Sequence, residues 1–93
     1  MKVHYKVFDS LAAIEEKPND QDIEFIIETK NEKAFNKLHE VRKFFESDKV
    51  LTDVLFYTLG DHSFQVIVRR DSYTAFVLGL FGFQLIKQIE WRE

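Results

Sequence analysis

The fold is decided by residues 22–47, which read DIEFIIETKNEKAFNKLHEVRKFFES. Apolar and polar residues alternate from Asp22 to Thr29, which is typical of a half-buried β-strand. From Asn31, a favourable N-cap residue, apolar residues recur at the three-to-four spacing of an amphipathic helix. The stretch therefore predicts a strand and then a helix with one apolar stripe, made of Ala34, Phe35, Leu38, Val41 and Phe45.

Two more strands and a second helix are predicted downstream. Residues 50–59 and 63–70 are rich in β-branched and aromatic residues, and the Gly-containing segment 60–62 joins them as a hairpin connection. Asp71 or Ser72 is expected to cap a helix that runs through Phe81, with Gly82 at the C′ position that favours φ > 0. Residues 84–91 are expected to form the last strand. This order predicts an α+β protein with a ferredoxin-like βαββαβ sandwich, in which both helices cover one face of an antiparallel sheet.

The first 21 residues are expected to extend this sandwich. Residues 2–8 alternate between apolar and polar positions and predict an extra N-terminal strand at a sheet edge. Residues 10–16 are expected to form a short helix capped by Asp9 or Ser10, and the segment around Pro18 is expected to be a loop. We therefore expect one domain, 1–93, with residues 1–21 as the extension and 22–93 as the core. Its centre should be built where Phe35, Leu38, Val41 and Phe45 pack on Phe25, Ile27, Phe64 and Val66.

Composition narrows the class of protein. The chain has 93 residues, of which 45% are hydrophobic and 31% charged, and its ten Phe favour a compact core. It has no Cys and no long apolar segment at the N-terminus, so we expect a cytoplasmic protein without disulfides. The longest uncharged stretch, residues 72–86, is too short and too often broken by Gly to span a bilayer, so no membrane partner is expected.

Nucleic-acid binding is not expected. The net charge is −3, whereas nucleic-acid-binding surfaces are basic. The strand order resembles that of an RNA-recognition module, but that module stacks bases on aromatic residues of its third strand. The corresponding strand, residues 63–70, has one aromatic residue, Phe64, on the face assigned to the core.

No catalytic, cofactor-binding or metal-binding residue is predicted. Consecutive Asp61, His62 and Ser63 cannot readily converge as a hydrolase triad and are typical turn residues. His4 and His39 do not share a metal-ligand spacing with His62, and the acidic run from Asp20 lacks the Gly and Glu of a calcium loop. Arg69 and Arg70 precede the second helix and leave an anion site there as an alternative, although Asp71 fills the same place.

The second helix is the candidate interface. One of its faces is uncharged and includes small residues: Ser72, Ala75, Leu78, Gly79 and Gly82. Solvent-facing helix surfaces normally carry charges, so this face predicts contact with a second copy or with another protein. The open sheet face, with Ile26, Ile67 and Ile86, is the alternative route.

Three functional hypotheses follow, in order of preference. The first is a non-enzymatic interaction module that works as a homodimer or within a larger assembly. The second is a small-ligand sensor or small enzyme with a cleft at an oligomer interface. Nucleic-acid binding is the third, and substrate, partner identity and pathway are not encoded in any motif of the chain.

Overall fold

The computed structural model describes residues 2–47 and 53–93. Along this part of the chain the elements are β1 (Lys2–Val7), β2 (Ala12–Pro18), β3 (Asp22–Thr29), α1 (Glu32–Ser47), β4 (Val54–Thr58), β5 (Ser63–Arg69), the short 3₁₀ helix η1 (Arg70–Ser72), α2 (Tyr73–Gly82) and β6 (Ile86–Arg92). The strand predicted over 50–59 corresponds to β4. Residues 50–52 of that prediction, and Asp48 at the predicted end of the first helix, lie outside the described residues.

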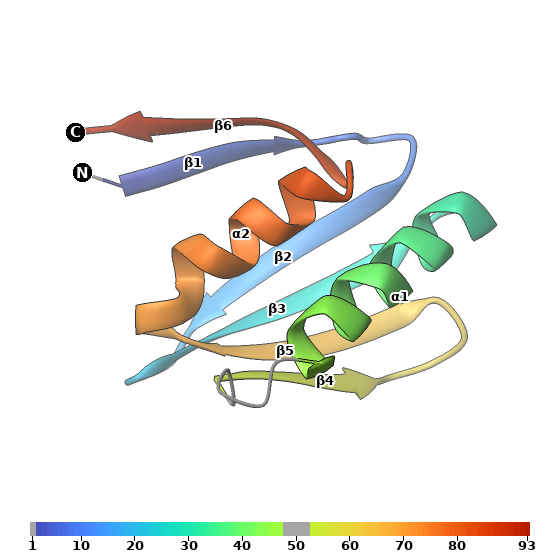
Figure 1. Cartoon of the computed structure of the whole chain (residues 1–93), viewed down its shortest axis with the longest axis horizontal. Coiled ribbons are helices and arrows are strands. Elements are labelled where there is room, and N and C mark those ends of the chain that lie inside the picture. Colours follow the sequence, from blue (N-terminus) through green and yellow to red (C-terminus); the bar gives the residue numbers. More distant parts are fainter. Residues whose placement is uncertain (1, 48–52) are drawn as a thin grey trace.

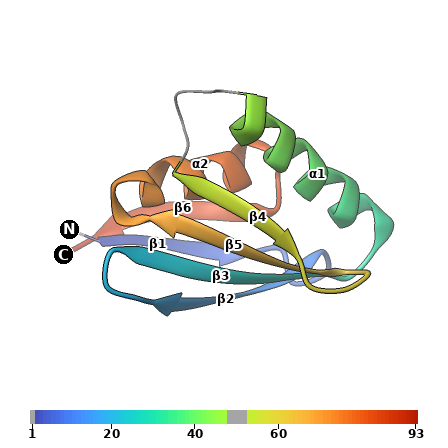
Figure 2. The same cartoon turned by 90° about the horizontal axis from the view of Figure 1, so that it is seen from below.

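Four antiparallel strands form the main sheet in the order β2-β3-β5-β4. The register places Phe25 of β3 opposite Glu16 of β2 on one side and opposite Val66 of β5 on the other. Both helices cover the same face of this sheet, as Figures 1 and 2 show from two directions. The predicted α+β class, with both helices on one face, is therefore confirmed.

The last strand does not join the main sheet, and this part of the prediction was wrong. We expected residues 84–91 beside the strand at 22–29, but β2 occupies that position. β6 instead pairs antiparallel with β1, with Tyr5 opposite Ile89, and this two-stranded terminal ribbon runs along the side of α2 that faces away from α1 (Figure 1). β1 is therefore a ribbon strand and not an edge strand of the main sheet.

The helix predicted over residues 10–16 is also absent, because this segment is β2. Ala12 and Ile14 point to the core side, and Glu16 follows them on the same side, opposite Phe25. An inward carboxylate interrupts the apolar alternation that would have predicted a strand. The loop expected around Pro18 is a tight turn after the last residue of β2, closed by a bond from the Asn19 N–H to the Asp22 carbonyl (2.9 Å).

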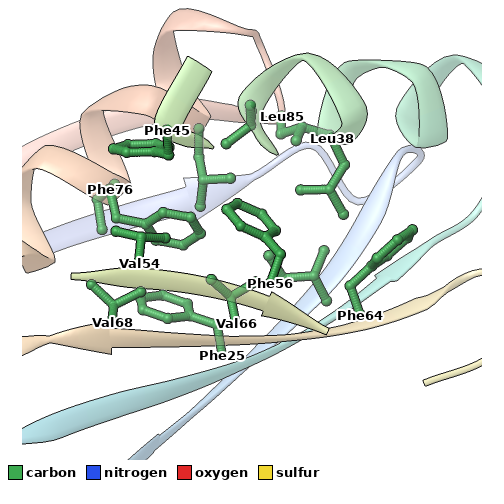
Figure 3. Close-up of a cluster of buried hydrophobic side chains, with 14 of the residues drawn as sticks. Phe25, Leu38, Phe45, Val54, Phe56, Phe64, Val66, Val68, Phe76 and Leu85 are labelled. Atoms are coloured by element: carbon green, nitrogen blue, oxygen red, sulfur yellow. The ribbon is translucent and has the colours of Figure 1, made fainter. Parts of the chain in front are cut away.

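The core lies between the helices and the sheet, as predicted (Figure 3). The Asn31 side-chain oxygen accepts a hydrogen bond from the Ala34 N–H at 2.8 Å, which confirms Asn31 as the N-cap of α1. The α1 stripe then packs with the inward residues of β3 and β5. Phe35 is only partly buried at the margin, where its ring lies 5.7 Å from that of Phe64.

The ends of α2 differ from the prediction. Ser72 occupies the N-cap position without a capping bond, and its hydroxyl lies 3.4 Å from a carboxylate oxygen of Asp53. Gly82 is the last helical residue and has no positive φ; the left-handed residue is Gln84, with φ of 65°. The Leu85 N–H donates to the Leu80 carbonyl (2.9 Å) and the Gln84 N–H to the Phe81 carbonyl (3.0 Å). This is the Schellman pattern, so the helix ends two residues later than Gly82 alone suggested.

Candidate functional site

The residues of the predicted interface fall into two groups. Ala75, Leu78 and Gly82 are exposed on the outward side of α2, whereas Ser72 is buried and Gly79 is partly covered. A Cβ atom added at Gly79 would lie 2.8 Å from Cε2 of Phe45, so the missing side chain makes room for α1 of the same chain. Gly79 therefore has a packing role within the chain.

An apolar surface runs along the outward side of α2. Leu78 is 53% exposed and Phe81 is 44% exposed, and no residue of the helix is charged. We name this surface the α2 crest; it consists of Ala75, Leu78, Phe81 and Gly82. Phe44 of α1, 49% exposed, extends it at the end of the helix, where its ring lies 6.1 Å from that of Phe83.

Two crest residues were missed from the sequence. Phe81 was expected to face the sheet, but the buried side of α2 is centred on Phe76, Val77 and Leu80. Each residue turns the helix by about 100°, which carries Phe81 past the edge of the buried arc. Phe44 lies outside the apolar stripe of α1, and an aromatic residue on the polar side of a helix was the signal for it.

The open face of the main sheet is mixed in character. Leu55 and Tyr57 of β4 are about half exposed (49% and 48%), and Ile26 and Ile67 are partly exposed beside them. Ile86 was expected among them but is buried in the core, because β6 belongs to the terminal ribbon. The β2 and β3 side of the same face carries carboxylates: Glu15, Glu24 and Glu28.

A polar cluster lies between the terminal ribbon and α2. Glu16 reaches this position because it points to the inner side of β2, under the ribbon. The hydroxyl of Tyr5, on β1, donates to its Oε2 atom. The hydroxyl of Tyr73, the first residue of α2, donates to the same oxygen at 2.9 Å. A single carboxylate oxygen thus connects β1, β2 and α2.

The two tyrosines are held in their neutral form. Burial raises the pKa of Tyr5 well above its ordinary value of 10.0, and the hydrogen bond to Glu16 and the charge of that carboxylate raise it further. Burial is also the largest cause of the raised pKa of Tyr73, followed by the Glu16 charge and hydrogen bond. These hydroxyls act as donors to Glu16, and neither is poised to act as a base near neutral pH.

A cleft opens beside this cluster. It has a volume of about 430 Å³ and is lined by residues from five elements: Lys2, Val3, Glu16, Ile23, Arg70, Tyr73, Thr74 and Trp91. We name it the Glu16 cleft. The sequence gave no signal for it, because its residues are far apart along the chain and Glu16 lay in a segment predicted as a helix.

The remaining chemistry-bearing residues have structural roles. Asp61 and His62 form the turn between β4 and β5, as expected, and the Leu59 N–H closes this turn on the Ser63 carbonyl at 2.9 Å. Arg70 donates to the main-chain carbonyls of Asn19 (2.7 Å) and Asp20 (3.0 Å), and so fastens η1 to the turn between β2 and β3. Neither arrangement forms a catalytic group.

Searches of the described residues for two further kinds of site gave no candidates. Within residues 2–47 and 53–93, no three His, Cys, Asp or Glu side chains lie close enough together to hold a metal ion. The helices in this part of the chain are also too short or too polar to cross a membrane. No protein-family model, curated protein or solved structure matches the chain.

Proposed function

We propose that the protein is a non-enzymatic interaction module that pairs with a second copy of itself through the α2 crest. The observation that carries this proposal is that α2 has no charged residue and exposes Leu78 and Phe81. Solvent-facing helices normally carry charges on their outer side, as α1 does with Lys33, Glu40 and Lys43. An uncharged outer side on a helix is therefore best explained by contact with another apolar surface.

The shape of the crest favours a second copy over an unrelated partner. Leu78 projects between two small residues, Ala75 and Gly82, which lie about one turn away on either side of it. A large side chain beside low positions is self-complementary when two identical helices meet around a two-fold axis. Each Leu78 would then sit over the small residues of the partner helix.

The size of the crest predicts a weak dimer. A standard interface buries about 800 Å² on each partner. The chain exposes 6052 Å² in total, so such an interface would cover roughly an eighth of its surface. The ten residues of α2 span only about 15 Å, so the contact has to extend onto Phe44 of α1. We expect a dissociation constant in the micromolar range, because small interfaces leave little surplus after the entropy of association.

The open sheet face is the weaker alternative. Its apolar residues, Leu55 and Tyr57 among them, share the face with Glu15, Glu24 and Glu28. Docking of that face would desolvate carboxylates, which costs free energy unless each of them gains a partner. The crest carries no such cost.

A matched pair of variants tests the proposal. Leu78→Lys places a charge on the crest, and Leu55→Lys makes the same change on the open sheet face, where the leucine is similarly exposed (53% and 49%). Sedimentation velocity over a range of concentrations should give a dimer for the wild type and Leu55→Lys, and a monomer for Leu78→Lys. Circular dichroism should show that both variants stay folded.

Two results would contradict the proposal. A dimer that survives Leu78→Lys but is lost in Leu55→Lys would move the interface to the sheet. A wild-type protein that stays monomeric at high micromolar concentration would remove self-association altogether.

A further inference from the structure

The Glu16 cleft is independent of the crest and has the features of a small-molecule site. Its volume of about 430 Å³ falls in the range of ligand pockets, which is roughly 300–1,000 Å³. Its walls come from the terminal ribbon, β2, β3 and the start of α2, so separate elements hold its polar groups in place. Polar groups that converge on a partly apolar pocket are typical of sites that orient a ligand.

Glu16 presents an available acceptor to this cleft. Both tyrosine hydroxyls donate to Oε2, and within residues 2–47 and 53–93 no hydrogen-bond donor reaches Oε1. The two bonds fix the carboxylate in one orientation, so a ligand would not have to order it. An ammonium group is the donor best suited to a carboxylate oxygen held in this way.

Two cations line the same cleft. Arg70 bonds to main-chain carbonyls, which satisfies donors of its guanidinium group without neutralising its charge. Among the described residues neither Arg70 nor Lys2 forms an ion pair with a carboxylate. The cleft therefore combines one negative group with two positive ones, and a ligand that carries only an ammonium group would meet net repulsion.

An apolar wall completes the cleft. The Trp91 side chain lines it while remaining 59% exposed, and Val3, its register partner on β1, lies beside it. Ile23 of β3 lines the cleft as well. An exposed indole next to aliphatic side chains is a surface on which an aromatic or large aliphatic group can stack.

We propose that the Glu16 cleft binds a small zwitterion, namely a free α-amino acid with a large apolar side chain. Its ammonium group would bond to Oε1 of Glu16, its carboxylate would face Lys2 and Arg70, and its side chain would lie against Trp91. This site lies within one chain, whereas the ligand site expected from the sequence was at an oligomer interface. Binding should therefore not depend on the α2 crest.

L-Phenylalanine is the probe for the test, followed by amide chemical shifts of the ¹⁵N-labelled protein during a titration. We expect saturable shifts that map to the lining residues of the cleft. N-Acetyl-L-phenylalanine lacks the ammonium group and L-phenylalaninamide lacks the carboxylate, so each should bind roughly tenfold more weakly or worse, as expected for loss of a charge-assisted bond.

Three variants separate the contributions. Glu16→Gln keeps an acceptor for the tyrosine hydroxyls but removes the charge, and it should abolish the preference for the free ammonium group. Lys2→Gln and Trp91→Leu change exposed side chains, so they should stay folded and bind more weakly. Leu78→Lys, which tests the dimer, should bind as the wild type does.

Contrary outcomes are equally defined. Absence of saturable shifts in the cleft up to tens of millimolar L-phenylalanine would overturn the proposal. Equal binding of the three phenylalanine compounds would also overturn it, because it would show that the charged groups of the cleft do not select the ligand.

Discussion

Gly79 and Gly82 lie in the same helix but should respond in opposite ways to the same substitution. In Gly79→Ala the new Cβ atom would lie 2.8 Å from Cε2 and 3.0 Å from Cζ of Phe45. At Gly82 nothing lies within 4 Å of the added atom. Neither glycine has a positive φ, so alanine fits the backbone at both positions.

Phe45 cannot readily move away from the new methyl group. Its side chain is only 3% exposed, and its ring is held between those of Phe44 and Phe76, with centroid distances of 5.2 and 5.6 Å. Overpacking of such a core costs about 1–3 kcal/mol. The higher helix propensity of alanine offsets about 1 kcal/mol of this, which leaves Gly79→Ala less stable than the wild type by up to about 2 kcal/mol.

Gly82→Ala gains helix propensity without a clash, so it should be more stable than the wild type by about 0.5–1 kcal/mol. Urea unfolding followed by circular dichroism measures both variants under identical conditions. In a chain of this size, 1 kcal/mol corresponds to a melting-temperature shift of about 4–8 °C, which is easily resolved.

A third variant identifies the cause. In a Phe45→Leu background the ring atoms that meet the new methyl group are gone, so Gly79→Ala should become neutral or stabilising. The two changes are therefore expected to be coupled, as neighbouring core substitutions are. If Gly79→Ala stabilises the wild-type protein as much as Gly82→Ala does, the contact between Gly79 and Phe45 does not constrain the packing of the two helices.

Three other predictions concern stability. Gln84→Gly should raise the free energy of unfolding by about 1 kcal/mol, because Gln84 has a left-handed backbone (φ 65°), whereas Gln88→Gly, within β6, should lower it; urea titration measures both. Phe25→Ala should cost about 3–5 kcal/mol, because Phe25 is fully buried, and a melting curve like that of the wild type would refute its place in the core. The raised pKa values of Tyr5 and Tyr73 mean that the folded protein keeps protons which the unfolded chain releases above its ordinary tyrosine pKa of 10.0. Stability should therefore fall as the pH rises above about 10, and Tyr5→Phe should reduce this fall when urea unfolding is compared at about pH 9 and pH 11; an unchanged pH dependence would contradict the shift.

The parts of the fold that follow local periodicity could be predicted from the sequence. The alternation in β3, the stripe of α1 and its Asn31 cap are properties of neighbouring residues, and the structure contains all of them. The order of β3, β5 and β4 in the sheet also matches the expected sandwich. These features depend on which residues face the core, and the apolar pattern states that directly.

The neighbour of β3 could not be predicted in the same way. β2 takes the place expected for β6 because the hairpin after Pro18 brings β2 back along β3, and β1 then remains free to pair with β6. Glu16 hides β2 from a hydrophobicity pattern, since its inward carboxylate is satisfied only by two tyrosines distant in sequence. The cleft was missed for the same reason, whereas three crest residues, Ala75, Leu78 and Gly82, were identified from the uncharged face of α2.

The most direct test of pairing through the α2 crest is an intermolecular distance between two copies. The chain has no Cys, so Ala75→Cys on the crest and Ala13→Cys on exposed β2 each give a single site for a spin label. The helices and the main sheet are stacked along the shortest dimension of the molecule, which is 22 Å (Figure 2). If the crests meet, electron–electron double resonance should give a distance well below 22 Å between labels at position 75, and about twice 22 Å between labels at position 13. The reverse order of the two distances would contradict pairing through the crest.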